Sequence, residues 1–231
     1  MKTLIIGDIH GCLNELKALI TKAGPVDQII SCGDLIDRGP DSFGVIQYCI
    51  DNNIQVVLGN HEKMAIEALT DYLGPKYPYQ RMGLFSSDWF ANGGKSAFDS
   101  FGDNLQFCLD YFKSLPLFIQ TDHTINGKPV VISHTCLNRN SDNILKLEQP
   151  LSARTIIELV WSRTQSSDFS GHFFNIYGHT PTDYLGIKSA QPLITKFGIN
   201  LDTGCVYDSP DRGKLTGVLL PSMQIIQQDR L

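Results

Sequence analysis

Three short motifs near the N-terminus constrain the fold of this chain more than any other feature. They are Gly-Asp-Ile-His-Gly at 7–11, Gly-Asp-Leu-Ile-Asp-Arg-Gly at 33–39 and Gly-Asn-His-Glu at 59–62, and each follows an apolar run typical of a buried β-strand. Asp8 and Asp34 are 26 residues apart, as are Asp34 and Asn60, which is about the length of one strand and one crossover helix. We therefore expect βαβ units at the N-terminus, with parallel strands that bring the three loops to one sheet edge, where α/β proteins bind ligands.

The chain as a whole predicts more strands than one sheet carries easily. Strands are expected at 3–6, 28–32, 54–58, 118–119, 129–133, 174–177, 199–201, 215–220 and 223–227, and helices at 12–22, 42–50, 62–72, 105–115 and 152–163. We therefore predict an α/β fold in which two sheets of mixed strands form a β-sandwich flanked by helices. With 231 residues, the chain is expected to form a single domain over 1–231.

The segment 74–127 differs in pattern from the rest of the chain. Gly74-Pro75 is a loop signal, and Trp89-Phe90 and Asn92-Gly93-Gly94 precede the expected helix at 105–115. We interpret this segment as an insertion, or lid, that covers the site and influences which substrate is bound. The alternative is that its aromatic residues pack a small satellite core of their own.

The composition argues against several kinds of partner. The 24 acidic and 19 basic residues give a formal charge of −5, and no cluster of basic residues stands out, so a nucleic acid duplex is not an expected partner. No apolar stretch approaches the roughly 20 residues of a membrane span, and the N-terminal apolar run is too short for a signal peptide. The six cysteines are scattered, as is typical of reduced, buried thiols. We expect a soluble, cytoplasmic protein without a membrane partner, either a monomer or a weak oligomer.

Side chains in the motif loops and in two later loops could together bind two metal ions. The candidate ligands are Asp8, His10, Asp34, Asn60, His134 and His179. A single aspartate after a strand could equally cap a helix, but five such motifs together favour a metal site. Asp34 comes from the middle unit and is the natural bridge between two cations about 3.5–4 Å apart. Oxygen and nitrogen donors without thiolate favour manganese, iron or zinc over calcium or copper(I). We expect two divalent ions, manganese first, with iron or zinc as the alternatives.

The five ordered motifs resemble the metallophosphoesterase superfamily, and within it the phosphoprotein phosphatase branch. Further elements at 92–94, 161–163 and 202–204 are similar to the short bacterial and phage serine/threonine phosphatases. The resemblance implies a first metal held by Asp8, His10 and Asp34, and a second held by Asp34, Asn60, His134 and His179. It also implies that His61 is the general acid with Asp37 as its partner, and that Arg38 and Arg163 bind the substrate's phosphate.

These residue types together suit the hydrolysis of a phosphomonoester. Two cations lower the pKa of water, so that a hydroxide bridging them can attack phosphorus in line. Arg38 would neutralise charge on the phosphate oxygens, and a protonated His61 beside Asp37 would give the leaving alkoxide its proton, an effect worth about 10²–10⁴-fold in rate. We therefore predict a metal-dependent phosphatase of phosphoserine and phosphothreonine in proteins, with phosphotyrosine as a further substrate.

Leu58 keeps a second substrate class open. The phosphoprotein phosphatases usually have arginine just before the third motif, whereas the symmetrical dinucleoside tetraphosphatases resemble this chain in having leucine there. Those hydrolases look to lack the aspartate that this chain has at Asp37, although some related hydrolases retain it. The alternative function is therefore hydrolysis of dinucleoside polyphosphates or related phosphoanhydrides. A third hypothesis is a metal-binding scaffold without activity, against which the presence of both His61 and Asp37 argues.

Three other residues have side chains that occur in active sites, but their sequence context favours other roles. Cys32 and Arg38 have the spacing of a cysteine-dependent phosphatase loop, but Cys32 ends an apolar strand, so we expect a buried thiol with a raised pKa and no thiolate chemistry. His123 lacks a matching motif and is expected in a loop or in solvent. Tyr207 lies in a loop near the last motifs, where we expect it to have a role in a turn.

Overall fold

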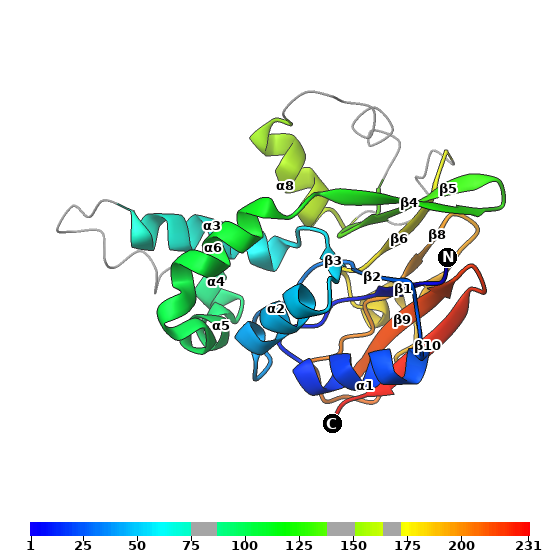
Figure 1. Ribbon diagram of the computed structural model, residues 1–231, viewed down its shortest axis with the longest axis horizontal. Coiled ribbons are helices and arrows are strands. Elements are labelled where there is room, and N and C mark those ends of the chain that lie inside the picture. The colour runs from blue at the N-terminus through cyan, green and yellow to red at the C-terminus, as the bar shows by residue number, and fades with distance from the viewer. Residues whose placement is uncertain (75–86, 138–150, 164–171) are drawn as a thin grey trace.

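Two five-stranded β-sheets pack face to face and position the loops that carry the motifs (Figure 1). The computed structural model describes residues 1–74, 87–137, 151–163 and 172–231. In the order of pairing, the first sheet contains β10 (Gln224–Asp229), β9 (Lys214–Leu220), β1 (Thr3–Ile6), β2 (Gln28–Ser31) and β3 (Gln55–Val56). The second sheet contains β4 (Phe118–Ile125), β5 (Lys128–Ser133), β6 (Phe174–Tyr177), β8 (Gly198–Asn200) and β7 (Leu193–Ile194). The predicted α/β sandwich of two mixed sheets is confirmed.

An apolar core between the sheets holds them together. Ile5 of the first sheet and Ile132 and Ile176 of the second belong to one fully buried cluster. The neighbours of Ile5 on β1, Leu4 and Ile6, point to the opposite face and belong to a second buried cluster under the helices. Strand β1 is therefore covered on both sides, which explains why its sequence is an unbroken apolar run.

Helices cover the outer faces of both sheets. They are α1 (Leu13–Ala23), α2 (Ser42–Asp51), α3 (Asn60–Leu73), α4 (Asp88–Ala91), α5 (Gly94–Phe101), α6 (Leu105–Ser114) and α8 (Ala153–Trp161), with short 3₁₀ turns η2 (Gly102–Asn104) and η4 (Thr182–Leu185). On the first sheet, α1 packs Leu16 and Leu19 into the cluster that contains Leu4. On the second sheet, α8 packs Leu159 against the cluster that contains Val131.

The pairing of the strands brings the motif loops together. Strand β1 runs parallel to β2, with Ile6 opposite Ser31, and β2 runs parallel to β3, with Ser31 opposite Val56. The three strands therefore end side by side, and one motif follows each of them. In the second sheet β5, β6 and β8 are also mutually parallel, and β5 and β6 precede the loops of His134 and His179. The predicted convergence of the loops at one edge is confirmed.

The segment 74–127 is only partly an insertion between the sheets. Residues 118–125 form β4, which pairs antiparallel with β5, so this part of the segment belongs to the second sheet; the lid role of the segment stays a prediction. Trp89, Phe101 and Phe112 are buried in the same cluster as α1 to α3, so they are part of the main core rather than a satellite core. Residues 75–86 of the expected lid lie outside the described residues.

The second sheet also contains a histidine that the sequence pattern did not explain. His123 lies on β4, half-buried, and its Nε2 is 2.9 Å from the hydroxyl oxygen of Thr3 on β1. This contact links the edge strand of one sheet to the middle strand of the other, so the expectation of a solvated loop histidine is wrong.

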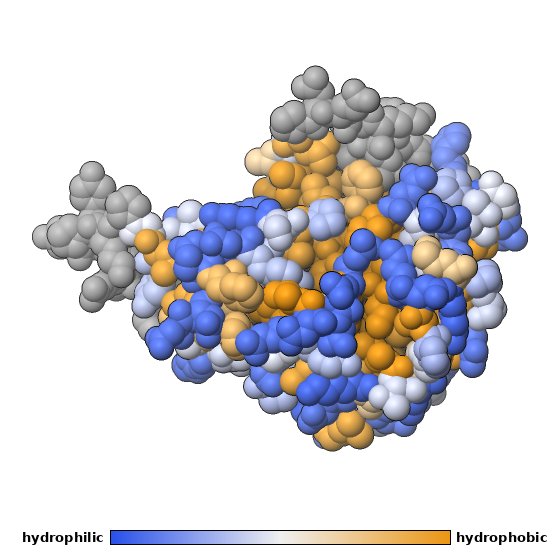
Figure 2. All heavy atoms as spheres, viewed as in Figure 1, coloured by the Kyte–Doolittle hydropathy of each residue, from blue (hydrophilic) through white to orange (hydrophobic). Residues whose placement is uncertain are grey.

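Among the helices described, none combines the length and the apolar character needed to cross a bilayer. Apolar side chains are visible at the surface over α8 (Figure 2), where Ile157 is 48% exposed.

Candidate dinuclear metal site

The backbone of the motif loops takes up unusual conformations at the expected site residues. His10, Asp34, Asp37, Arg38 and His179 all have positive φ angles, between 48° and 76°. Such angles are uncommon for residues other than glycine and persist only where the surrounding structure holds them. Here the amides of Ile9 and His10 both donate to the backbone oxygen of Asp34, at 3.0 and 2.9 Å, which ties the first loop to the second.

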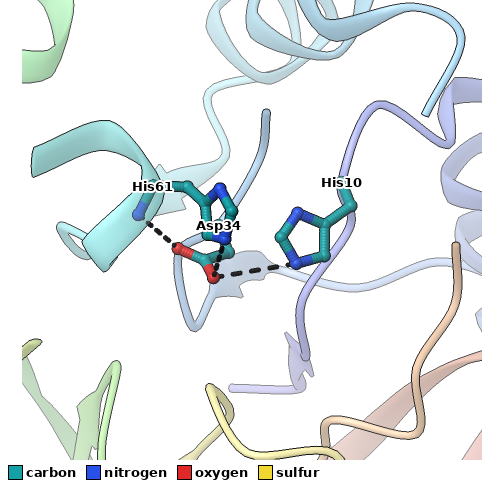
Figure 3. Close-up of side chains that lie close together, drawn as sticks. All are labelled: His10, Asp34 and His61. Atoms are coloured by element: carbon teal, nitrogen blue, oxygen red, sulfur yellow. Dashed lines mark hydrogen bonds and ion pairs between the residues drawn. The ribbon is translucent and has the colours of Figure 1, made fainter. Parts of the chain in front are cut away.

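Asp34 lies at the centre of the site and faces groups on two sides (Figure 3). Its Oδ2 is 3.7 Å from the Nε2 of His10 and 3.9 Å from the Nε2 of His61. Its Oδ1 is 3.4 Å from the Nε2 of His134 and accepts a hydrogen bond from the amide of His61 at 3.0 Å. A carboxylate whose two oxygens face different ligand groups has the arrangement of a bridge between two cations.

His134 and Asn60 bring acceptor atoms together without a proton between them. The Nδ1 of His134 lies 2.8 Å from the backbone oxygen of Cys32, which can only accept, so Nδ1 carries the proton. Burial lowers the pKa of His134, so the ring is neutral and its Nε2 bears a lone pair. This nitrogen faces the Oδ1 of Asn60 at 2.9 Å, and the same oxygen lies 2.9 Å from the Nδ1 of His179. The lone pairs of His134 and Asn60 therefore face one another, an arrangement that a shared cation would stabilise.

His10 is held in the same way on the other side of Asp34. Its Nδ1 is 2.8 Å from the backbone oxygen of Ile36, so the proton lies on Nδ1 and the Nε2 lone pair faces the site. Burial, with a smaller contribution from His61 and Arg38, lowers the pKa of His10 well below its usual value. In this structure the guanidinium of Arg38 donates to the Nε2 at 2.7 Å.

The acidic side chains of the site are crowded and buried. Burial, together with the charges of Asp202 and Asp34, raises the pKa of Asp8 well above its usual value. Burial also raises the pKa of Asp34, but its interaction with the imidazoles of His134, His61 and His10 outweighs burial and lowers that pKa overall. Buried carboxylates beside neutral imidazoles have a deficit of positive charge, which divalent cations would supply.

The described residues contain two groups of three possible metal ligands. Within each group the ligand atoms all lie within 4.8 Å of one another. One contains His10, Asp34 and His61, and the other contains Asp34, His134 and His179. Asp8 is in neither group, although its carboxylate lies beside the second one and accepts from the amide of His179 at 3.0 and 3.2 Å. The donor atoms of the two groups are of the oxygen and nitrogen types that divalent cations bind, and the tautomers of His10 and His134 suit that role.

His61 lies between Asp37 and Asp34 and pairs with Asp37. The Nδ1 of His61 is 2.5 Å from Oδ2 of Asp37, while its Nε2 points toward Asp34. Trp89 donates its indole N–H to both oxygens of Asp37, at 2.9 and 3.0 Å, and is only 1% exposed. Burial raises the pKa of Asp37. Asp37 therefore fixes the orientation of the His61 ring through Nδ1 and leaves Nε2 facing Asp34.

Glu62, at the end of the third motif, positions the loops without facing the cluster. Its Oε2 accepts from the amides of Asp34 at 3.0 Å and Gly59 at 3.1 Å, and its Oε1 accepts from Leu35 at 2.7 Å. The sequence does offer a signal for this role, because a glutamate three residues after a helix N-cap closes a capping box. The additional bonds to the second motif could not be predicted from that local pattern.

The candidate metal ligands His10 and His179 border a cavity of about 170 Å³, and both expected phosphate-binding arginines line it. It is lined by His10, Arg38, Arg163, His179, Pro181, Tyr184, Asp202 and Tyr207. Tyr207 therefore belongs to the wall of the cavity, whereas its sequence favoured a role in a turn over a position facing the site. Asp202, the first residue of the element at 202–204, also lines this cavity, and burial raises the pKa of its carboxyl to about 7.

The thiol mechanism considered for Cys32 is not supported. Burial raises the pKa of the Cys32 thiol well above its usual value, as predicted. All six cysteines are buried and free. The contribution of Cys32 to the site is its backbone oxygen, which fixes the tautomer of His134.

The chain belongs to the calcineurin-like phosphoesterase family, whose model matches residues 1–203. It is similar to the asymmetrical bis(5'-nucleosyl)-tetraphosphatase PrpE of Bacillus cereus, with 27% identity over 255 aligned positions that cover 98% of this chain and 93% of that protein. It is also 37% identical over 93 positions to serine/threonine-protein phosphatase 1 of Salmonella typhimurium, covering 39% of this chain and 38% of that one. The solved structure of a candidate diadenosine tetraphosphatase shares the fold, with a TM-score of 0.66, 20% identity and coverage of 100% and 94% of the two chains.

The family relationship predicted from the motifs is confirmed, and the chain is a metal-dependent phosphoesterase. The curated relatives include both substrate classes that the sequence left open. The relative that matches almost the whole chain is named for a dinucleoside tetraphosphate, and the one that matches a shorter part is named for a phosphoprotein. These similarities therefore do not distinguish between the two substrate classes.

Proposed function

We propose that this phosphoesterase hydrolyses phosphomonoesters, with phosphoserine and phosphothreonine in proteins as its main substrates and phosphotyrosine as a further one. The observation that carries the proposal is the pair of His61 and Asp37, which lies 2.5 Å apart beside Asp34. The alkoxide of serine or threonine is a poor leaving group, so its departure needs a proton donor. A phosphoanhydride releases a phosphate, for which the same donor matters much less.

Each candidate residue has a place in this reaction. Asp8, His10 and Asp34 would hold one divalent cation, and Asp34, Asn60, His134 and His179 would hold the other. Manganese is our first choice, with iron or zinc as alternatives. When bound, the two cations would lower the pKa of water at the site and so supply the nucleophile. Arg38 and Arg163 would bind the phosphate oxygens from the cavity wall, and His61 would donate its Nε2 proton to the leaving oxygen.

The substitution His61→Asn tests the proposal. It removes the proton donor, so turnover of a phosphoserine peptide should fall by about 10²–10⁴-fold. Turnover of p-nitrophenyl phosphate should fall less, because p-nitrophenolate leaves without a proton. Bound metal, measured by elemental analysis, should stay at the wild-type amount. If the variant instead loses metal together with activity, His61 is a ligand and the proposed acid role is wrong.

Hydrolysis of dinucleoside polyphosphates is the second candidate function. The similarity over 98% of the chain to a protein named for that activity favours it, as does Leu58 in place of the arginine that is usual in phosphoprotein phosphatases. Measuring kcat/KM for diadenosine tetraphosphate and for a phosphoserine peptide on the same Mn²⁺-loaded sample compares the two functions. A clear preference for the nucleotide would make the second candidate the principal activity.

A further inference from the structure

Three planar side chains stack along one side of the cavity mouth. The guanidinium carbon of Arg212 lies 4.5 Å from the ring centroid of Tyr184 and 4.6 Å from that of Tyr207. These distances are those of cation–π contacts. Tyr184 comes from η4, while Tyr207 and Arg212 come from the loop between β8 and β9. We call Tyr184, Arg212 and Tyr207 the stack.

The stack is fixed in place although its outer ring is exposed. Both Nε and Nη2 of Arg212 donate to Oδ2 of Asp183, at 2.8 and 2.7 Å. Beneath it lies Gly204, with a φ of 67°, where a Cβ would come within 3.0 Å of the Arg212 side chain. Tyr184 is 65% exposed, yet Arg212 lies over its ring. An ordered aromatic ring that is open to solvent is ready to bind a planar group at little entropic cost.

The stack continues directly into the catalytic cavity. Tyr184 and Tyr207 line the same cavity as His10 and Arg38. The guanidinium carbon of Arg38 lies 6.0 Å from the ring centroid of Tyr207, so the phosphate-binding arginine and the stack are neighbours. A ligand whose phosphate lies at Arg38 would therefore present its next groups to the stack.

We propose that the stack is a nucleobase subsite, in which the exposed ring of Tyr184 stacks against the base of a nucleoside oligophosphate held through its phosphates by Arg38 and Arg163. The subsite deepens, and rests on, the second candidate function. A nucleobase matches a rigid aromatic face because it is itself flat and rigid. The guanidinium groups of Arg38 and Arg163 in the same cavity can neutralise the several charges of an oligophosphate.

The test compares Tyr184→Ala with Tyr184→Phe and Tyr184→Trp on Mn²⁺-loaded protein. Loss of base stacking should raise KM for diadenosine tetraphosphate in Tyr184→Ala by about 5- to 150-fold. The Phe and Trp variants, which keep an aromatic face, should stay within about twofold of wild type. Hydrolysis of β-glycerophosphate, which has no planar group to stack, should change much less than KM for the nucleotide in all three. Phe107→Ala, which removes a 48% exposed aromatic ring on α6, is the matched control.

Inhibition by AMP separates failure of the subsite from failure of the second candidate function. If the wild type does not cleave diadenosine tetraphosphate, AMP should still inhibit p-nitrophenyl phosphate hydrolysis more tightly than inorganic phosphate does, and Tyr184→Ala should abolish the difference. The proposal is overturned if Tyr184→Ala changes neither KM nor AMP inhibition. It is equally overturned if hydrolysis of β-glycerophosphate falls in parallel, or if KM for a phosphopeptide rises more than KM for the nucleotide.

Discussion

Two backbone carbonyls decide which imidazole nitrogens face Asp34. The oxygens of Ile36 and Cys32 accept from the Nδ1 atoms of His10 and His134, each at 2.8 Å, and so direct both Nε2 lone pairs into the site. The proposed role of these histidines as metal ligands would therefore depend on the backbone of neighbouring loops as well as on their own identity. Substituting either carbonyl-bearing residue leaves the carbonyl in place, so these contacts are insensitive to side-chain change.

The sequence motifs marked the residues of the site that face the cluster, because each follows a strand end at a regular spacing. They did not mark the residues that act through contacts between distant loops. Trp89 reaches Asp37 across 52 positions of the chain, and Tyr207 meets Arg38 only because the loop between β8 and β9 folds back to the first sheet. Such contacts depend on tertiary packing, which a local pattern does not contain.

Trp89→Phe tests how Asp37 is held. The variant keeps an aromatic ring in the core but loses the N–H that donates to Asp37 at 2.9 and 3.0 Å. A hydrogen bond to a charged group is worth about 1.5–3 kcal/mol, so turnover of phosphoserine peptides should fall at least about tenfold. A series of substrates with increasingly good leaving groups should show the defect shrinking, while metal content stays at the wild-type level.

Phe101→Leu is the control for Trp89→Phe, because Phe101 stacks on Trp89 in the same core without a contact to Asp37. An equal defect for all leaving groups in Trp89→Phe, or the same defect in Phe101→Leu, would show that Trp89 only fills the core.

At the scale of elements, the strands predicted most accurately are those whose two faces are both buried. Strands β1 and β2 sit between the sandwich core and the helices, so their apolar runs are unambiguous. Strand β4 lies at the edge of the second sheet, where all its residues except the buried Thr121 are exposed or half-buried, and only 118–119 was predicted. The two short helices α4 and α5 also escaped prediction, because one has 4 residues and the other has 8.

Gly94→Ala tests the packing of α4 and α5 against the site. A Cβ at Gly94 would lie 2.5 Å from the indole of Trp89, so alanine must push this ring away from Asp37. The free energy of unfolding should fall by about 1–3 kcal/mol, as is usual for overpacking. Thermal denaturation measures this loss, and turnover of phosphoserine peptides should fall with it.

Lys95→Ala, at the exposed next position of α5, should change neither stability nor turnover. A Gly94→Ala variant as stable and active as wild type would mean that Trp89 can shift without consequence for the site.

At the scale of the whole molecule, the site exists only when both sheets are packed together. Asp8, Asp34 and Asn60 follow strands of the first sheet, whereas His134 and His179 follow strands of the second. Cation binding therefore links the two halves of the sandwich, and it should stabilise the folded protein in proportion to the occupancy of the site.

The pH dependence of stability should differ between metal-free and metal-loaded protein. Burial raises the pKa of Asp202 to about 7 and that of Glu62 to about 8. The folded protein therefore keeps both carboxyls protonated to a higher pH than the unfolded chain does. Their contribution is full below the usual carboxyl pKa and is lost as pH rises through 7 and 8. The lowered pKa values of His10, His134 and His179 oppose this trend only below about pH 6.5. Metal-free protein should therefore lose stability between pH 6.5 and 8.5.

Thermal denaturation at several pH values, with EDTA or with Mn²⁺, measures this dependence. Bound cations should favour ionised carboxyls and remove the loss, and Asp202→Asn should reduce it in the metal-free protein. A metal-free protein that becomes more stable between pH 6.5 and 8.5 would contradict the electrostatics described for the site.

The number of cations bound per chain tests the shared role of Asp34 most directly. Elemental analysis of Mn²⁺-reconstituted protein should give two ions for the wild type and for Asp99→Asn, which changes an exposed carboxylate on α5. Asp34→Asn should hold fewer than one, because both sets of ligands lose the same carboxylate. A wild-type chain that binds a single ion, or an Asp34→Asn variant that keeps two, would contradict a dinuclear centre bridged by Asp34.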